Sequence, residues 1–152
     1  MSRRALGVVL ALLAGGAVLF FWPKKPLDDE GQIRALFAAC VQAAEDRKLD
    51  VISEAMAPEF KAHGANKDEV RQMLAFQLLR DKETVAVLNP SLDVTLELPK
   101  AKVSSELVFA RNKPKSAAEV APQSVVAAYH LDAQLEKRDG KWLFVSAAYR
   151  QH

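Results

Sequence analysis

The sequence has very little cysteine and no concentrated set of metal-binding residues in its 152 positions. Cys40 is the only cysteine, which excludes an intramolecular disulfide and a cysteine-based metal site. The three histidines, His63, His130 and His152, are too scattered to indicate a metal site. The sequence also has no glycine-rich phosphate loop and no Gly-x-Ser-x-Gly motif. We therefore expect neither a metal nor a cofactor.

Acidic residues are missing from the first 27 positions, where Arg3, Arg4, Lys24 and Lys25 carry the charge. The formal net charge of +2 comes from 21 basic and 19 acidic residues. Without those four residues, 17 basic residues remain against 19 acidic ones, so the rest of the chain is near −2. An acidic domain without a basic stripe argues against nucleic-acid binding.

Residues 5–22 form a hydrophobic run without charge, "ALGVVLALLAGGAVLFFW". A helix of these 18 residues would be about 27 Å long, close to a hydrocarbon core of about 30 Å. Basic residues flank the run, and Trp22 stands where interfacial aromatic residues are typical. This pattern predicts a transmembrane anchor at residues 5–22. The alternative is a cleaved signal peptide, but the small residues at 14–16 lie inside the run, and cleavage there would leave "AVLFFW" exposed.

This prediction divides the chain into a cytoplasmic tail at residues 1–4, the anchor, a linker at residues 23–27 and a domain at residues 28–152. A short tail followed by a large domain favours an N-terminus inside the cell. We therefore expect a single-pass protein of the cell inner membrane whose C-terminal domain is periplasmic or extracellular.

The first half of the domain has helical periodicity. Asp29 and Gln32 resemble a capping box, and the helix that they begin should end near residues 47–48. A short second helix is expected at residues 50–57, followed by "PEFKAHG" as a connector. Asn66 and Glu69 predict the start of a third helix, which would bury one apolar stripe. Cys40 falls on the apolar side of the first helix, where a buried thiol is the ordinary interpretation.

From residue 84 onward the period changes to the alternation of strands. Strands are expected at residues 84–98, with a bulge or break at Asn89-Pro90-Ser91, and at residues 102–110. Residues 111–123 form a long polar connection, typical of either a functional or a disordered segment. Residues 124–151 predict two long strands joined by a tight turn at Asp139-Gly140.

Candidate site residues lie on this last hairpin. A two-residue turn would place His130 opposite Tyr149 and put both on the same face as Asp132. A three-residue turn with a bulge would shift the second strand by one residue and exchange the side chains on its two faces. The sequence leaves this register open. His130, Asp132 and Tyr149 are weak candidates for an acid–base cluster. The alternative, which we favour, is that they cover the solvent side of the sheet.

Two stretches resemble the nuclear transport factor 2-like superfamily, which includes SnoaL-like domains and has a cystatin-like fold. They are "IRALFAACVQAAEDRKLDVISEAMAPEF" near the start and "DGKWLFVSAAYR" near the end, and the likeness extends over about residues 28–152. The resemblance implies an α+β fold with three N-terminal helices packed on a strongly curved, four-stranded antiparallel sheet. In such a cone-shaped roll the open end can hold a ligand.

The expected function is that of a membrane-tethered binding or scaffold domain without catalytic activity, attached through residues 5–22 and able to bind a protein partner or form a homodimer. The alternative is a small-molecule binding protein, or an isomerase-like or cyclase-like enzyme, that uses the cone. No catalytic set of the superfamily can be matched to this sequence. The many alanines on the last two strands leave room for a cavity and keep the alternative open.

Overall fold

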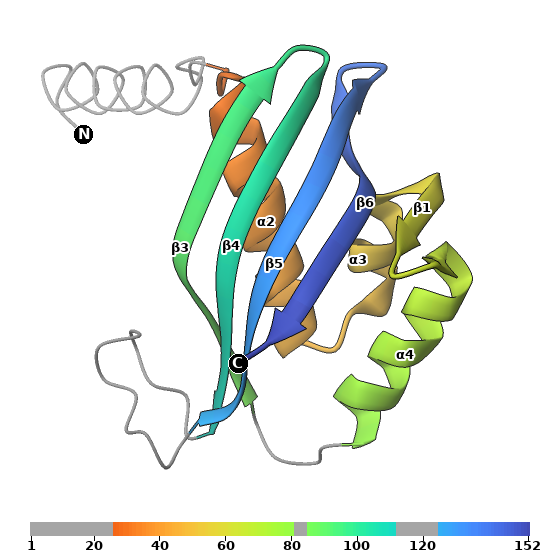
Figure 1. The fold of residues 1–152 in the computed structure, drawn as a ribbon, viewed down its shortest axis with the longest axis vertical. Coiled ribbons are helices and arrows are strands. Elements are labelled where there is room, and N and C mark those ends of the chain that lie inside the picture. Colours follow the sequence, from red (N-terminus) through yellow and green to blue (C-terminus); the bar gives the residue numbers. More distant parts are fainter. Residues whose placement is uncertain (1–25, 81–84, 112–124) are drawn as a thin grey trace, which may run out of the picture.

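The computed structural model describes residues 26–80, 85–111 and 125–152, which form a curved sheet with helices on one side (Figure 1). The helices are α2 (Asp29–Glu45), α3 (Leu49–Glu54) and α4 (Lys67–Arg80). The strands are β1 (Met56–Ala62), β2 (Ala65–Asn66), β3 (Val85–Glu97), β4 (Lys100–Arg111), β5 (Val125–Arg138) and β6 (Lys141–Gln151). Helix α2 runs along the inner side of the sheet (Figure 1).

The helix starts follow from local capping. Asp28, not the predicted Asp29, caps α2, because its carboxylate accepts a hydrogen bond of 2.7 Å from the Gly31 amide. In α4, the Asn66 side chain accepts from the Glu69 amide at 3.0 Å, and the Glu69 carboxylate accepts from the Asn66 amide at 2.8 Å. The predicted capping box of this helix is confirmed.

The end of α2 has an unusual residue in a common motif. The Arg47 amide donates to the Ala44 carbonyl at 3.2 Å, and the Lys48 amide donates to the Ala43 carbonyl at 2.8 Å. These two bonds define a Schellman motif, whose left-handed position is normally occupied by glycine. Arg47 occupies it here, with φ +57°.

The sheet differs from the four-stranded antiparallel sheet that we predicted. In the described residues it has six strands in the order β2-β1-β6-β5-β4-β3, and β1 pairs parallel with β6. The expected connector "PEFKAHG" contains most of β1, and the expected second helix ends at Glu54 rather than at residue 57. Strand β1 was missed because it follows a helix directly and its buried and exposed residues do not alternate regularly, with a register shift between Met56 and Lys61.

The predicted anchor lies outside the part of the chain that the structure describes. Within the ranges that the structure describes, no helix is long and apolar enough to cross a membrane. Residues 5–22 lie outside those ranges, as does most of the predicted polar connection at residues 111–123.

The register shifts in each of the three pairs of long strands, and two of these shifts bear on the predictions. The β3–β4 register shifts between Leu88 and Ser91, at the predicted interruption around Pro90. The β5–β6 hairpin has the predicted two-residue turn, since Arg138 pairs with Lys141 and Leu135 with Phe144. Beyond Leu135 the register shifts by one residue, so that Leu131 pairs with Tyr149. This second bulge decides which side chains face the interior.

The core fills the space between α2 and the sheet. Ile33 is completely buried and packs with six other buried residues: Phe37, Ala101, Val103, Ala133, Leu135 and Trp142. A smaller cluster of Met56, Phe60 and Ala62 lies on β1. Phe144 and Ala147 pack against both clusters and join them.

Candidate functional site

A cavity of about 630 Å³ lies between the concave side of the sheet, α2 and α4. All three helices and five of the six strands contribute to its wall. The lining side chains are mainly apolar, and α4 supplies Val70, Met73, Leu74 and Leu78. Because α4 has no fully buried residue, these side chains border open space rather than a packed core.

The cavity is apolar at its inner end and mixed where it meets solvent, since Met73 and Tyr149 are exposed there as well as polar residues. Buried side chains form the inner end: Phe37, Met56, Phe60, Ala62 and Ala133. The exposed lining residues include Arg47 and Gln77. This gradient suits a molecule with an apolar body and one polar end.

Aromatic rings form a row across the strands of the cavity wall. Phe109 meets Tyr129 edge to face at 5.8 Å between ring centroids, and Tyr129 meets Tyr149 at 6.2 Å. The His63 ring lies 4.6 Å from the Tyr149 ring, and its Nε2 accepts a hydrogen bond of 3.0 Å from the Tyr149 amide. These contacts place two tyrosine side chains in the wall of the cavity.

The charged lining residues lie near the end of α2. The Glu45 carboxylate accepts a hydrogen bond of 2.8 Å from the Val87 amide, which ties the helix to the edge strand β3. Arg47 is the only cationic side chain among the described lining residues, and Glu45 is the only anionic one. Burial raises the pKa of the Cys40 thiol to about 11, so this lining residue is protonated at neutral pH.

The predicted site residues lie on opposite faces of the sheet. Asp132 and His130 are close on the outer face, where the His130 Nε2 is 3.3 Å from an Asp132 oxygen. Tyr149 lines the cavity on the inner face. The bulge between Gln134 and Leu135 causes this separation, because it shifts the register by one residue. The three residues therefore do not form the cluster that the simple hairpin register suggested.

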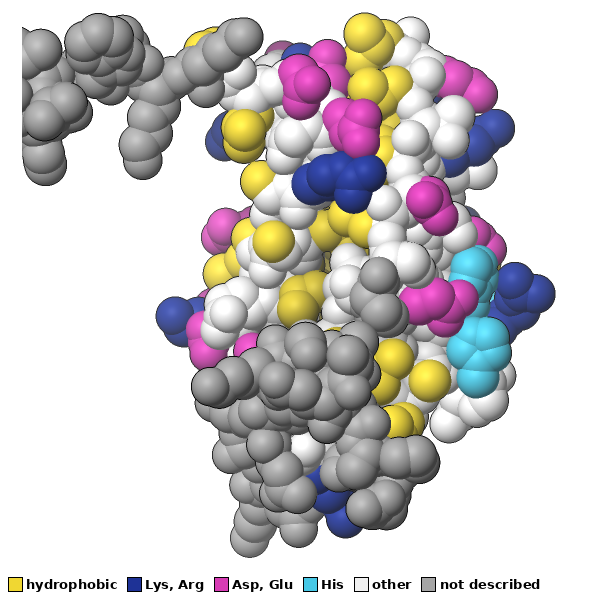
Figure 2. All heavy atoms as spheres, turned by 90° about the vertical axis from the view of Figure 1, so that its left-hand side faces the viewer, with side chains coloured by type: hydrophobic (Ala, Val, Ile, Leu, Met, Phe, Trp, Pro, Cys, Tyr) yellow, Lys and Arg dark blue, Asp and Glu magenta, His cyan; other side chains and the backbone are white. Residues whose placement is uncertain are grey.

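On the outer face His130 has partners that the sequence did not identify. Its Nδ1 lies 2.5 Å from a Glu106 oxygen, and its Nε2 lies 3.3 Å from the Ser104 hydroxyl. The hydrogen bond with Glu106 raises the pKa of His130, and the charge of Asp132 adds to the effect. The same hydrogen bond lowers the pKa of Glu106, whose other oxygen is 3.1 Å from the His152 ring. Figure 2 shows histidine side chains beside acidic ones on this part of the surface.

This arrangement does not favour His130 as a general base. A serine, a histidine and a glutamate in contact resemble a nucleophile, a base and an orienting group. However, carboxylates lie near both ring nitrogens, and they stabilise the doubly protonated imidazolium, which cannot accept a proton. In the described part of the chain, no group of three or more His, Cys, Asp or Glu side chains is placed to hold a metal ion.

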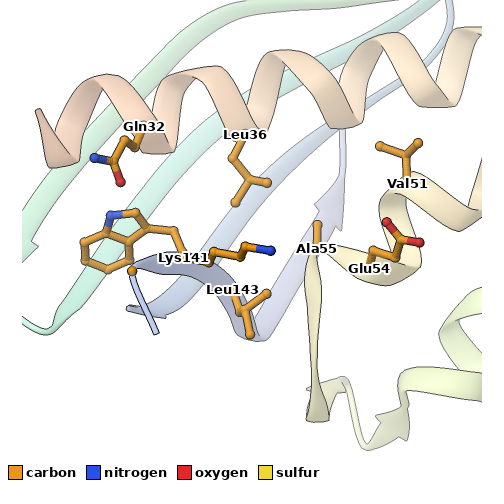
Figure 3. Close-up of a pocket in the computed structure, with 9 residues that line it drawn as sticks. Gln32, Leu36, Val51, Glu54, Ala55, Lys141 and Leu143 are labelled. Atoms are coloured by element: carbon orange, nitrogen blue, oxygen red, sulfur yellow. The ribbon is translucent and has the colours of Figure 1, made fainter. Parts of the chain in front are cut away.

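A second, shallower cavity of about 450 Å³ lies between α2, α3 and the start of β6 (Figure 3). Leu36 of α2 lies across it from Leu143 of β6, and Glu54, Lys141 and Trp142 also line it. It is smaller than the cavity in the cone and is lined by fewer elements.

Several lining residues could not have been found as site residues from the sequence. Arg47 and Gln77 are ordinary polar residues of a helix end and a helix face in the sequence. The available signal was the alanine content of β5 and β6, since Ala127, Ala133 and Ala147 all line the cavity. Small side chains at these positions leave its volume unfilled.

The architecture defines a class: an α+β roll in which a curved sheet and helices enclose an apolar cavity. No protein-family model and no curated protein matches the sequence. Solved structures do share the fold. They include a nuclear transport factor 2-like protein of unknown function from Pseudomonas putida, with a TM-score of 0.64 and 13% identity over 82% of this chain and 88% of that one.

A protein with a cystatin-like fold from Nostoc punctiforme superposes with a TM-score of 0.63 and 13% identity, over 84% of this chain and 96% of that one. The structure of LinA gives 0.62 and 12%, over 81% and 85%. The chain therefore carries a domain of the nuclear transport factor 2-like, cystatin-like fold, as the sequence resemblance predicted. At these identities the likeness establishes the fold, and the function has to come from the site.

Proposed function

We propose that this domain binds a small, mainly apolar molecule in the cavity of the cone. The observation that carries the proposal is the cavity itself, whose volume of about 630 Å³ lies within the usual range of ligand pockets. A domain that acted only as a scaffold would have no need of an unfilled interior. The alternative weighed from the sequence, a small-molecule site in the cone, is thus the better-supported function.

A binding role is favoured over catalysis by the chemistry of the wall. General acid–base catalysis needs a positioned donor or acceptor within hydrogen-bond reach of the substrate, supported by a second group. In the described part of the chain, no hydrogen bond joins the side chains of Cys40, Glu45, Tyr129 and Tyr149 to one another. The Glu45 carboxylate is engaged by the Val87 amide, and the raised pKa of Cys40 keeps its thiol protonated.

The protein partner or homodimer, and the membrane attachment through residues 5–22, stay predictions from the sequence. An exposed apolar row on α4 would suit a protein partner. Met73, Phe76 and Leu79 follow one another at three-residue steps, and Phe76 is 66% exposed. Of this row, Met73 also lines the cavity, whereas Phe76 and Leu79 are not among its lining residues.

The experiment measures binding of 1-decanol to the full-length chain by isothermal titration calorimetry. Ala147 lines the cavity, whereas the next residue, Ala148, is exposed on the outer face. We expect Ala147→Phe to fill the cavity and weaken binding about tenfold or more, and Ala148→Phe to bind like the natural chain. This matched pair also corrects for alcohol that associates with the predicted anchor or with detergent.

A second pair makes the test independent of one substitution. Ala127 lines the cavity, and Ala128 follows it on the other face of β5. Ala127→Leu should weaken binding, and Ala128→Leu should not. Equal decanol binding by all four variants and the natural chain would show that the cavity is not the binding site.

A further inference from the structure

The cavity wall contains a tyrosine hydroxyl that makes no hydrogen bond within the described part of the chain. This hydroxyl belongs to Tyr129, whose ring lies between the rings of Phe109 and Tyr149, at centroid distances of 5.8 and 6.2 Å. No side-chain oxygen or nitrogen of the described residues is both buried and without a partner, so the oxygen of this half-buried residue borders open space. Because Tyr129 lines the cavity on the inner face of the sheet, that space is the cavity.

The wall around this hydroxyl is apolar. Tyr129 pairs with Leu107 of β4, which also lines the cavity, and the neighbouring Phe109 shows that a ring without a hydroxyl fits the same wall. Where the fold buries another hydroxyl it supplies a partner, since the buried Ser105 donates to the Ser91 carbonyl at 3.1 Å. The Tyr129 hydroxyl is therefore available to a molecule in the cavity.

The charged groups of the wall do not favour an ionic ligand. The described lining residues include one anion, Glu45, and one cation, Arg47, so their charges balance. Glu45 accepts from the Val87 amide, and Arg47 also has a partner in the structure. A charged ligand would leave water without meeting an available opposite charge, which is strongly unfavourable. The cavity therefore suits an uncharged molecule.

The Tyr129 hydroxyl also imposes a requirement on that molecule. A ligand that fills the cavity removes the hydroxyl from water, and this is unfavourable unless the ligand supplies a new hydrogen bond. A carbonyl oxygen accepts such a bond and brings no donor that would need a partner of its own. A carbonyl group on an apolar body thus satisfies both the hydroxyl and the apolar wall.

We infer that the ligand is an uncharged molecule with an apolar body and a carbonyl group, and that the carbonyl oxygen accepts a hydrogen bond from the Tyr129 hydroxyl. This inference rests on the proposed function and specifies the chemical class of its ligand. The apolar body lies against the inner end of the cavity, where Phe37, Phe60 and Ala133 are buried.

The test compares 2-acetylnaphthalene with 2-ethylnaphthalene, which has nearly the same shape and no carbonyl oxygen. Binding of each to the full-length chain is measured by isothermal titration calorimetry. Tyr129→Phe should weaken binding of the acetyl compound about tenfold, because the carbonyl oxygen loses its donor. It should not weaken binding of the ethyl compound, which makes no hydrogen bond with Tyr129.

The infrared spectrum of the bound acetyl compound gives a second readout, because a hydrogen bond to a carbonyl oxygen lowers its stretching frequency. We expect a lower frequency in the natural chain than in Tyr129→Phe, a difference that a merely structural role of the hydroxyl would not produce. Ser104→Ala is the matched control, since it removes a hydroxyl from the outer face of β4, away from the cavity. It should bind both compounds like the natural chain.

Two results would overturn the role of Tyr129. One is an equal effect of Tyr129→Phe on both compounds together with an unchanged carbonyl frequency, which would mean that the hydrogen bond is absent. The other is a selective loss of the acetyl compound in Tyr149→Phe and not in Tyr129→Phe, which would assign the hydrogen bond to the neighbouring ring.

Two further outcomes separate this inference from the function on which it rests. If 1-decanol binds in the cavity but 2-acetylnaphthalene does not bind, the inference is wrong and the proposed function stands. If neither molecule binds, or if Ala147→Phe leaves the binding of both unchanged, the proposed function fails together with the inference.

Discussion

Replacing Arg47 with glycine should stabilise the protein. The left-handed conformation costs a residue with a Cβ atom roughly 1–2 kcal/mol, and glycine avoids this cost. About 0.5–1 kcal/mol of this stabilisation is lost again, because a glycine gives the unfolded chain more conformational freedom. With φ +57° at Arg47 and both hydrogen bonds of the Schellman motif in place, we expect Arg47→Gly to raise the free energy of unfolding by about 0.5–1 kcal/mol.

Urea unfolding followed by tryptophan fluorescence measures this change, since Trp142 is buried in the folded domain. The slope of the unfolding free energy against urea should stay constant. In a domain of this size the melting temperature should rise by roughly 1–4 °C.

Lys48→Gly is the control for Arg47→Gly, because Lys48 has φ −91° and gains nothing from the freedom of glycine. That substitution should lower the free energy of unfolding by about 0.5–1 kcal/mol. If Arg47→Gly destabilises the protein as much as Lys48→Gly does, the Arg47 backbone is not strained.

Two other predictions concern titration and reactivity. The hydrogen bond with Glu106 raises the pKa of His130, so the folded state binds a proton more tightly than the unfolded state does. The stability advantage of the natural chain over His130→Gln should therefore be fully present below pH 6.5 and decline as the pH rises through the higher folded pKa, as measured by urea unfolding at each pH. An advantage that is constant from pH 6 to 9 would contradict this assignment. Cys40, whose pKa burial raises to about 11, should react with iodoacetamide far more slowly at pH 8 than a free thiol, and saturating 1-decanol should slow it further because Cys40 lines the cavity. Mass spectrometry of the alkylated chain follows this reaction, and a rate equal to that of free cysteine would refute the buried environment.

The parts of the fold that the sequence predicted are those fixed by neighbouring residues. Asn66 and Glu69 lie one turn apart and form the capping box as expected. Asp139 and Gly140 determine their own turn, and Pro90 interrupts a strand because it has no amide hydrogen to donate. In each case the responsible residues are within a few positions of the feature.

The parts that were missed depend on residues far apart in the sequence. Strand β1 is a strand because it pairs with β6, and Met56 has no local signal that it will lie opposite Phe144. The turn at His63-Gly64 is a local signal for the pairing of β1 with β2. However, β2 covers only Ala65–Asn66 and is too short to show alternation. The face on which Tyr149 lies depends on a one-residue shift of the β5–β6 register between Gln134 and Leu135. No residue type in the hairpin predicts this shift. The alanines of β5 and β6 left room for a cavity, but its volume and most of its lining residues became known only from the structure.

The parallel pairing of β1 with β6 has a consequence for the order of assembly. Strands β3 to β6 are joined by antiparallel pairs between successive segments, so they can form early. Strand β1 reaches β6 only across the whole length of that meander, which makes its docking a late and entropically costly step. Because Met56 and Phe60 of β1 form part of the cavity wall, the binding pocket comes into existence only with that last step. A ligand in the cone would therefore bind the completed molecule alone and would draw the final docking equilibrium toward closure by mass action.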